Sequence, residues 1–306
     1  MKKILVLSLL LYTTQSYAAD KLSVMLDWFV NPDQAPLIIA QQKGYFTEQN
    51  LEVDIIEPSD TSLAPKMAAA EKVDLAFDSQ PQLTVQLSEG LPLIKVSAII
   101  DSPLNNLLAR KDSGIKSLSD FKNKTIGYSV AGYDSVILAA MLKNAGLNLD
   151  DVKTVNINWA ITQSLKSQQT DGVIGAYRIF ENIELAQSGI EPIAFYPEKH
   201  GIPHYEEMIL VANKNKSNDP RFKRFNLALE KAVNYIKEHP EDAWNSFISY
   251  KSGLDNALNK ASWQATIPLF ANNPAKHDPA PYKKFSQFLK DNGLTKTLID
   301  VPYYQP

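Results

Sequence analysis

The chain of 306 residues has no cysteine and only four histidines. It can therefore form no disulfide, no cysteine-ligated metal cluster and no lipid anchor on a cysteine. His200 and His204 have a spacing that two metal ligands can share, but Gly201 and Pro203 exclude the helix that would align both rings. We expect neither a metal site nor a cofactor.

Glycine-rich and catalytic motifs are also missing. With 12 glycines, the sequence contains no phosphate-binding loop, no dinucleotide fingerprint and no Gly-x-Ser-x-Gly elbow. Its charge is nearly balanced, with 31 basic and 34 acidic residues and a net charge of −3. This balance favours neither a nucleic-acid groove nor a membrane-surface patch. We therefore expect no nucleic-acid partner.

The apolar block Ile4–Leu11 is too short to cross a bilayer. Two lysines precede it, and Ser16-Tyr17-Ala18 places small residues at the two positions that a signal peptidase inspects. These features predict a secretory signal over residues 1–18, cleaved after Ala18; the alternative is an N-terminal strand or anchor helix. Cleavage would leave 29 basic and 34 acidic residues, a net charge of −5. Without a cysteine to lipidate, the mature chain is expected in a bacterial periplasm.

About 288 residues would remain after cleavage, which is enough for two lobes at roughly one domain per 100 to 200 residues. In the first part of the chain, apolar runs alternate with helical patterns. The pattern predicts strands over 22–26, 51–56, 73–77 and 93–100, with helices over 35–43, 61–71 and 80–89 between them. This alternation is typical of a parallel, doubly wound α/β sheet.

The same alternation starts again after residue 105. Strands are expected over 106–110, 125–129, 153–158 and 172–176, with helices over 134–144, 162–168 and 179–188. The segment 204–213 has a polarity pattern like that of 102–111, so we predict two strands that cross between the lobes. On this interpretation lobe 2 is residues 105–205, and lobe 1 is discontinuous, residues 19–104 and 206–306. The last part of the chain is predicted to form helices that close lobe 1, over 219–238, 240–249, 253–259, 262–270 and 280–291.

The run Leu26-Asp27-Trp28-Phe29-Val30-Asn31-Pro32 follows the first predicted strand. Ligands of α/β sheets bind beyond the carboxyl ends of the strands, so this run is a candidate binding segment. A carboxylate from Asp27, a ring from Trp28 and an amide from Asn31 suit a flat, polar small molecule. The alternative for Asp27 is a local role in the turn.

Further aromatic and acidic residues lie at or soon after other predicted strand ends. Tyr128, Trp159 and Tyr177 are candidate walls of the site, and Glu181 is a candidate second carboxylate. Core packing is the alternative for Tyr128 and Trp159. For Glu181 the alternative is a favourable position near a helix N-terminus.

Two strand-to-helix turns are ambiguous. Asp78 belongs to the turn Asp78-Ser79-Gln80-Pro81, and Tyr133 to the turn over 129–135. A turn before a helix can offer N–H groups to an anion or a carbonyl, but Asp134 would repel an anion if it pointed inward. Ordinary turns without ligand contact are the alternative for both.

An ordered set of short motifs resembles the pyrimidine-precursor-binding proteins (ThiY type) of thiamine-salvage ABC importers, over about residues 22 to 215. The set begins with Asp27-Trp28-Phe29-x-Asn31-Pro32 and Lys43-Gly44-Tyr45-Phe46. It continues with Gln80-Pro81, Ser102-Pro103-Leu104-Asn105, Ile126-Gly127-Tyr128, Gly175-Ala176-Tyr177 with Glu181, and Gly201-Ile202-Pro203-x-Tyr205-x-Glu207.

The resemblance implies a type II periplasmic binding protein, in which two doubly wound α/β lobes joined by two crossing strands close on a ligand. It also implies that the ligand is a 4-amino-2-methylpyrimidine, either formylaminopyrimidine or hydroxymethylpyrimidine. An ABC permease with its ATPase would be the partner, and the receptor would be a monomer and not an enzyme. The family position is what favours ligand contact for Glu181. The expected ligand-binding residues are Asp27, Trp28, Asn31, Asp78, Tyr128, Tyr133, Trp159, Tyr177 and Glu181.

Two other classes remain open. A receptor of the same fold for alkanesulfonates, taurine or nitrate would need several N–H donors and a nearby cation, and Arg178 is the only arginine of lobe 2 besides Arg110. Pyrimidine synthases resemble the fold as well, but they carry a cysteine-rich iron-binding motif, and this chain has no cysteine. The sequence therefore favours a receptor over an enzyme.

Overall fold

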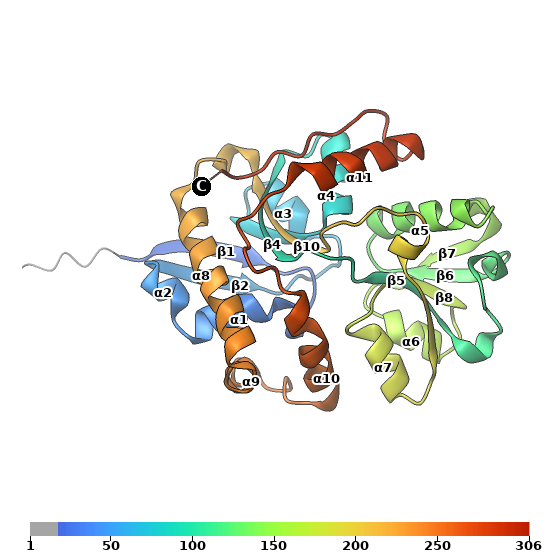
Figure 1. Cartoon of the computed structure of the whole chain (residues 1–306), viewed down its shortest axis with the longest axis horizontal. Coiled ribbons are helices and arrows are strands. Elements are labelled where there is room, and N and C mark those ends of the chain that lie inside the picture. Colours follow the sequence, from blue (N-terminus) through green and yellow to red (C-terminus); the bar gives the residue numbers. More distant parts are fainter. Residues whose placement is uncertain (1–17, 306) are drawn as a thin grey trace, which may run out of the picture.

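The computed structural model describes residues 18–305, so the predicted signal segment lies outside the described residues except for Ala18. Two α/β lobes lie side by side along the longest axis of the molecule (Figure 1). None of the described helices is long and apolar enough to span a membrane.

The sheet of lobe 1 has five strands in the order β2-β1-β3-β10-β4. β1 pairs in parallel with β2 and β3, whereas β10 pairs antiparallel with β3 and β4. All residues of β4 and β10 are buried, as expected for strands covered on both faces. The strand bounds are Asp20–Met25 (β1), Leu51–Ile56 (β2), Leu75–Asp78 (β3), Leu93–Ile100 (β4) and Met208–Asn213 (β10).

Helices cover both faces of this sheet because alternate residues of its strands are apolar on each side. Val24 and Leu210 pack into one buried cluster, and their neighbours Met25 and Val211 into another. The first cluster includes side chains of α1 (Ala35–Gln42), α2 (Tyr45–Glu48), α8 (Pro220–Glu238) and α9 (Pro240–Ser249). The second includes side chains of α3 (Ala64–Ala69) and α4 (Gln80–Ser88).

The sheet of lobe 2 also has five strands, in the order β7-β6-β8-β5-β9. β6 pairs in parallel with β7 and β8, and β5 pairs antiparallel with β8 and β9. One face packs against α5 (Tyr133–Asn144), and the other against α6 (Ile161–Lys166) and α7 (Glu181–Gln187). The strand bounds are Asn105–Arg110 (β5), Thr125–Tyr128 (β6), Lys153–Asn156 (β7), Gly172–Tyr177 (β8) and Pro192–Phe195 (β9).

The expectation of parallel sheets is wrong in one respect, since both sheets are mixed. The chain passes between the lobes twice, over 101–104 and 196–207. β5 and β10 therefore each start at the junction and run away from it, whereas β3, β4, β6 and β8 end there. A strand that enters from the junction must pair antiparallel with strands that run toward it.

Other details also differ from the sequence expectation, and three of them concern whole elements or helix starts. β9 was not predicted, because it is a short strand that begins at a proline and is only partly buried. The two helices expected over 253–259 and 262–270 are replaced by α10 (Ala257–Thr266), which begins where Asn256 accepts a hydrogen bond from the Asn259 N–H. α3 begins at Ala64, three residues later than expected.

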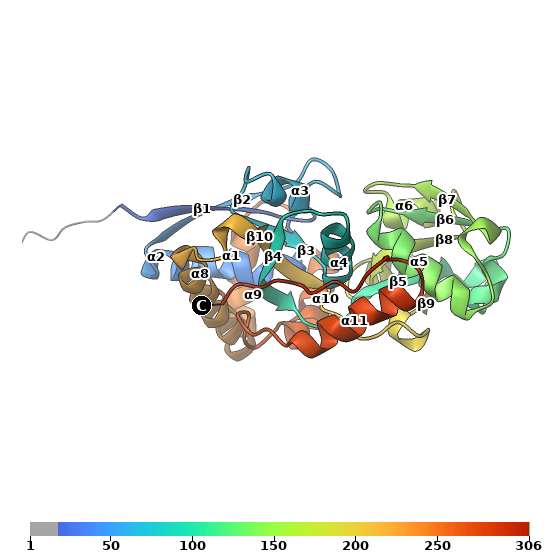
Figure 2. The ribbon, with the colours of Figure 1, turned by 90° about the horizontal axis from the view of Figure 1, so that it is seen from above.

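The last helix, α11 (Pro279–Asp291), contacts both lobes. Tyr282 packs with the buried cluster of lobe 1 beneath α3 and α4, whereas Phe285 and Leu289 pack with the cluster of lobe 2 beside α5. Figure 2 shows α11 lying across the junction of the lobes. The predicted lobe boundaries stay a prediction, with α11 as the element that belongs to neither lobe alone.

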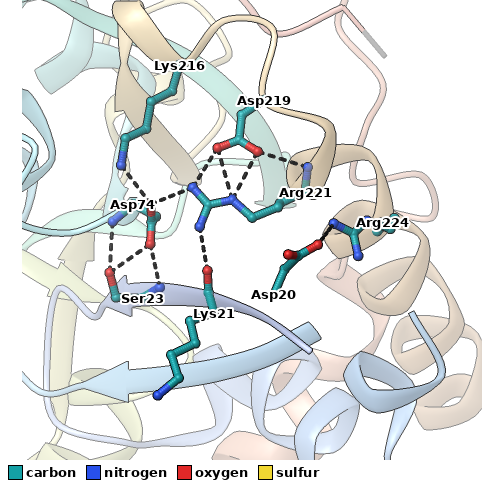
Figure 3. A network of polar contacts seen from close by, with 8 residues as sticks. All are labelled: Asp20, Lys21, Ser23, Asp74, Lys216, Asp219, Arg221 and Arg224. Carbon is teal, nitrogen blue, oxygen red and sulfur yellow. Dashed lines mark hydrogen bonds and ion pairs between the residues drawn. The ribbon is translucent and has the colours of Figure 1, made fainter. Parts of the chain in front are cut away.

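A polar network connects the start of β1 with the start of α8 (Figure 3). Asp74 accepts hydrogen bonds from the Ser23 N–H at 2.9 Å, from Lys216 at 2.7 Å and from Arg221 at 2.8 Å. Burial alone would raise the pKa of Asp74, but these three donors outweigh it and lower the pKa to about 2. Asp219 caps α8 by accepting from the Arg221 N–H. The network therefore joins three separate segments of lobe 1.

Candidate functional site

A cavity of about 770 Å³, counting the space at its mouth, lies between the two lobes. Residues at or just after the carboxyl ends of β1, β3, β6 and β8 line it, as expected for the ligand site of an α/β sheet. It is lined by Asp27, Trp28, Asn31, Asp33, Gln34, Thr61, Ala64, Pro65, Phe77, Asp78, Ser79, Gln82, Ser129, Val130, Tyr133, Asp134, Ile161, Gly175, Tyr177, Phe180, Glu181 and Glu207.

Most residues that the sequence put forward lie at this cavity. Seven of the nine line it, and they come from both lobes: Asp27, Trp28, Asn31, Asp78, Tyr133, Tyr177 and Glu181. Their contact with a ligand stays a prediction. Asp33, Asp134 and Glu207 line the cavity too and were not among the nine.

Two of the nine lie elsewhere. Tyr128 is half-buried and packs against the core cluster of lobe 2, which agrees with the alternative of core packing. Trp159 lines a neighbouring hollow and is 37% exposed. Its ring meets the ring of Trp28 edge-on, with the centroids 4.3 Å apart. Trp159 thus lies at the mouth of the cavity, and Tyr128 is not among the residues that line it; ligand contact by either residue stays a prediction.

Six carboxylates line the cavity, and among the described residues no lysine, arginine or histidine does. Burial raises the pKa of every one of them, and for Asp134 and Glu181 the pKa reaches about 7. At Asp33 the charges of Glu181, Asp27 and Glu207 raise the pKa further. The cavity is therefore suited to cations and to hydrogen-bond donors, and it disfavours anions. Its carboxylates are those of Asp27, Asp33, Asp78, Asp134, Glu181 and Glu207.

The loop after β1 is held by its own side chains. Asn31 accepts a hydrogen bond from the Asp33 N–H at 2.8 Å and caps the 3-10 turn Pro32–Gln34. Gln34 accepts from the Asn31 N–H at 3.0 Å and donates to Asp27 Oδ1 at 3.1 Å. Asn31 therefore shapes the loop, and Gln34 orients the Asp27 carboxylate.

In lobe 2, Asp134 lies in the first turn of α5. Its Oδ2 accepts from the Ser129 N–H at 2.9 Å and from the Val130 N–H at 2.8 Å. Gly175 makes room for it: its φ is +95°, and a Cβ there would lie 2.8 Å from Asp134 Oδ2. Asp134 thus points inward and uses the N–H groups that an anion would need.

Glu207 connects the site with the two crossing segments. Its Oε2 accepts from the Leu104 N–H at 2.7 Å and from the Asn105 N–H at 2.8 Å, and its Oε1 accepts from the Tyr133 hydroxyl. Glu207 lies one residue before β10, so it contacts the other crossing segment and α5 at once. On α7, Glu181 accepts from the Tyr177 N–H at 2.7 Å.

Several buried side-chain polar atoms of residues that line the cavity have no hydrogen-bond partner among the described residues. Three are carboxylate oxygens, Asp33 Oδ1, Asp78 Oδ2 and Asp134 Oδ1, and one is a donor, Trp28 Nε1. Buried polar groups are normally paired, so a ligand that brings several N–H or O–H donors and one acceptor would complete this site.

A comparison with known families matches residues 31–243 to the family described as NMT1/THI5 like. The chain belongs to the NMT1/THI5-like family.

Relatives of this NMT1/THI5-like protein are named for thiamine metabolism. It is 48% identical to a Haemophilus influenzae protein named for thiamine biosynthesis, over 96% of this chain and 94% of the relative. It is 28% identical to the formylaminopyrimidine-binding protein of Halalkalibacterium halodurans, over 76% and 71% of the two chains. A 4-amino-5-hydroxymethyl-2-methylpyrimidine phosphate synthase of Saccharomyces cerevisiae is 25% identical over 84% and 78%.

Among solved structures, the NMT1/THI5-like protein is similar to the alkanesulfonate-binding protein of Xanthomonas axonopodis pv. citri, which was solved with MOPS bound. The TM-score is 0.72 at 12% identity, over 94% of this chain and 98% of that one. At this identity the similarity shows the fold, which is the α/β fold of periplasmic binding proteins.

Proposed function

We propose that this NMT1/THI5-like protein is the periplasmic receptor of an ABC importer and that it captures a 4-amino-2-methylpyrimidine precursor of thiamine. The observation that carries the proposal is the cavity between the lobes, in which buried carboxylate oxygens lack hydrogen-bond partners. The family and its formylaminopyrimidine-binding member support the same ligand class.

An aminopyrimidine matches the cavity in chemical terms. Its exocyclic amine and a protonated ring nitrogen are donors for the carboxylates of Asp33, Asp78 and Asp134, and an unprotonated ring nitrogen can accept from Trp28 Nε1. Its flat faces suit the rings of Trp28 and Tyr177, which line the cavity from opposite lobes. Charge-assisted hydrogen bonds in a buried site supply both affinity and orientation.

A receptor for sulfonates or nitrate has less support, although the alkanesulfonate-binding protein shares the fold. Six carboxylates line the cavity, and Asp134 already accepts from the Ser129 and Val130 N–H groups. Arg178 pairs with Glu198 at 2.8 Å and is not among the residues that line the cavity. A bound anion would find no compensating cation among the residues that line the cavity, and the carboxyl groups that are ionised would repel it.

An enzyme that makes a pyrimidine phosphate has less support as well. The yeast relatives are named as such synthases, and their product carries a phosphate. The same carboxylates would repel that phosphate, and the chain has no cysteine for the iron-binding motif expected of synthases. We therefore propose binding and release of an unchanged ligand.

Delivery would follow from closure of the two lobes about the segments 101–104 and 196–207. Closure removes water from the pyrimidine and creates a shape that a permease with its ATPase can distinguish from the empty receptor. The predicted signal over residues 1–18 would export the chain to the periplasm, where we propose that it acts as a monomer.

Calorimetric titration tests the proposal directly. Purified protein is titrated with hydroxymethylpyrimidine and with formylaminopyrimidine. The ligand is then recovered, and its mass is measured by mass spectrometry. We expect one site with a dissociation constant between micromolar and nanomolar, which corresponds to a binding free energy of about 8 to 12 kcal/mol. The recovered ligand should be chemically unchanged. Glu181→Ala should weaken binding at least tenfold, whereas the control Glu191→Ala, at an exposed ion pair outside the cavity, should not. A chemically altered ligand, or a protein that binds only sulfonates, contradicts the proposal.

A further inference from the structure

A second hollow adjoins the carboxylate cavity at its mouth and has no role in the proposed contacts to the pyrimidine. Its empty volume is about 970 Å³, counting the space open to solvent. Four residues line both spaces, namely Trp28, Ile161, Phe180 and Glu181. A ligand in the carboxylate cavity can therefore extend into this mouth hollow past shared side chains. Its own lining includes Phe29, Trp159, Thr162, Glu184, Lys251, Asn256 and Asn259.

Aromatic rings from both lobes surround the mouth hollow. The Trp28 ring lies 4.3 Å from the Trp159 ring and 5.4 Å from the Phe29 ring, measured between centroids. Phe29 also lies 6.5 Å from Phe180. Phe29 is 44% exposed and Trp159 37% exposed, although such large rings are usually covered. A flat group seated here would cover rings from both lobes together.

The polar side chains of the hollow favour positive charge. Glu181 and Glu184 line it, and Thr162 donates a hydrogen bond to Glu184 at 2.5 Å. Lys251 lines it as well, but its ammonium pairs with Glu57 at 2.7 Å. Aromatic faces combined with carboxylates attract organic cations.

We propose that the mouth hollow is a second subsite, which holds a positively charged heteroaromatic ring attached to the pyrimidine. The receptor would then accept a two-ring cation of the thiazolium class, with its pyrimidine in the carboxylate cavity and its second ring against the exposed parts of the Trp159 and Phe29 rings. This inference rests on the proposed function, because the pyrimidine positions the second ring.

The test compares two ligands that share a pyrimidine. Calorimetric titrations with hydroxymethylpyrimidine and with thiamine give the ratio of their dissociation constants for each variant. In the unsubstituted protein thiamine should bind at least as tightly as hydroxymethylpyrimidine. Trp159→Ala should weaken thiamine binding about tenfold and hydroxymethylpyrimidine binding less than about twofold, because only thiamine reaches the hollow. Glu184→Gln should weaken thiamine binding about threefold and remove part of its salt dependence.

Leu298→Ala is the matched control, since Leu298 is an exposed apolar residue outside both spaces. It should leave both affinities unchanged. If hydroxymethylpyrimidine binds but thiamine does not, or if Trp159→Ala weakens both ligands equally, the second subsite is wrong and the proposed function stands. If no pyrimidine binds at all, the proposed function fails and this inference fails with it.

Discussion

Trp28 and Trp159 meet across the junction of the two lobes, with their ring centroids 4.3 Å apart and their planes at 61°. Trp28 follows β1 of lobe 1, and Trp159 lies between β7 and α6 of lobe 2. The residues lie 131 positions apart in the sequence, so this contact exists only when both lobes have folded and approached each other. Any change in the relative position of the two lobes would therefore change the contact between these two rings at the mouth of the cavity.

Trp28→Ala should weaken binding of hydroxymethylpyrimidine about tenfold. The substitution removes a ring from the cavity wall and the Nε1 donor, and it also breaks the contact with Trp159. Aromatic contacts contribute about 0.5 to 1.5 kcal/mol beyond the area they bury, and a hydrogen bond adds about 1 kcal/mol. Calorimetric titration measures the change, with Leu227→Ala, an exposed residue of α8, as the control. An unchanged dissociation constant would remove Trp28 from the site.

The phosphate ester of hydroxymethylpyrimidine should bind at least about a hundredfold more weakly than the free alcohol. A hundredfold corresponds to about 2.7 kcal/mol, which is modest for an anion brought into a site lined by carboxylates. Competition titrations at low and high salt measure both ligands under the same conditions. Equal affinity for the ester and the alcohol would contradict the electrostatic account of the cavity.

The ligand-free protein should lose stability as the pH rises from 5 to 8. Burial raises the pKa of Asp134 and of Glu181 to about 7, above the ordinary values of 3.8 and 4.5. An acid whose folded-state pKa is raised contributes stability that is complete below its unfolded pKa and is lost as the pH passes through its folded pKa.

Thermal unfolding at several pH values checks this prediction. The midpoint temperature of unfolding should decrease as the pH rises from 5 to 8. Asp134→Asn should make this decrease smaller, because the amide carries no charge. Lys111→Gln is the control, since Lys111 forms an exposed ion pair and its loss should leave the slope unchanged. A midpoint that is constant over this range would be incompatible with buried carboxyl groups of raised pKa.

Asp74 should act in the opposite direction. Its folded-state pKa of about 2 lies below the ordinary 3.8, so its contribution to stability is present above about pH 4 and is lost as the pH falls toward 2. Asp74→Asn should lower the free energy of unfolding by about 1 to 2 kcal/mol at pH 7, after allowance for solvent screening. Urea unfolding at pH 7 and pH 2.5 measures the difference, which should shrink to about a third at the lower pH, just above the folded-state pKa. The exposed Asp54→Asn serves as the control.

Much of the local structure follows from the sequence. The apolar runs 51–56 and 93–100 are β2 and β4 with the predicted bounds. A buried or half-buried strand needs a continuous or alternating apolar pattern, which can be recognised in the sequence. Asp27 and Trp28 come directly after a strand end, which placed them at the candidate site before any contact was known. Caps and prolines likewise mark the starts of α4 and α11.

Side-chain direction at the strand ends was harder to predict. Tyr128 and Tyr133 are both aromatic residues near the end of β6, yet the first packs against the core of lobe 2 and the second lines the cavity. Their difference depends on the path of the turn between them, which Asp134 holds through the Ser129 and Val130 N–H groups. Local propensity does not encode that path.

The sequence alone determined most of the strands and helices and the segments that lie at strand ends, because these depend on residues close together in the chain; β9 and α10 are the exceptions. The tertiary structure alone decided that β5 and β10 run antiparallel to their neighbours and that Glu207 joins the two crossing segments. It also decided that six carboxylates from both lobes share one cavity. Each of these outcomes depends on groups far apart in the sequence. Their burial and their charge–charge interactions arise only when the lobes come together.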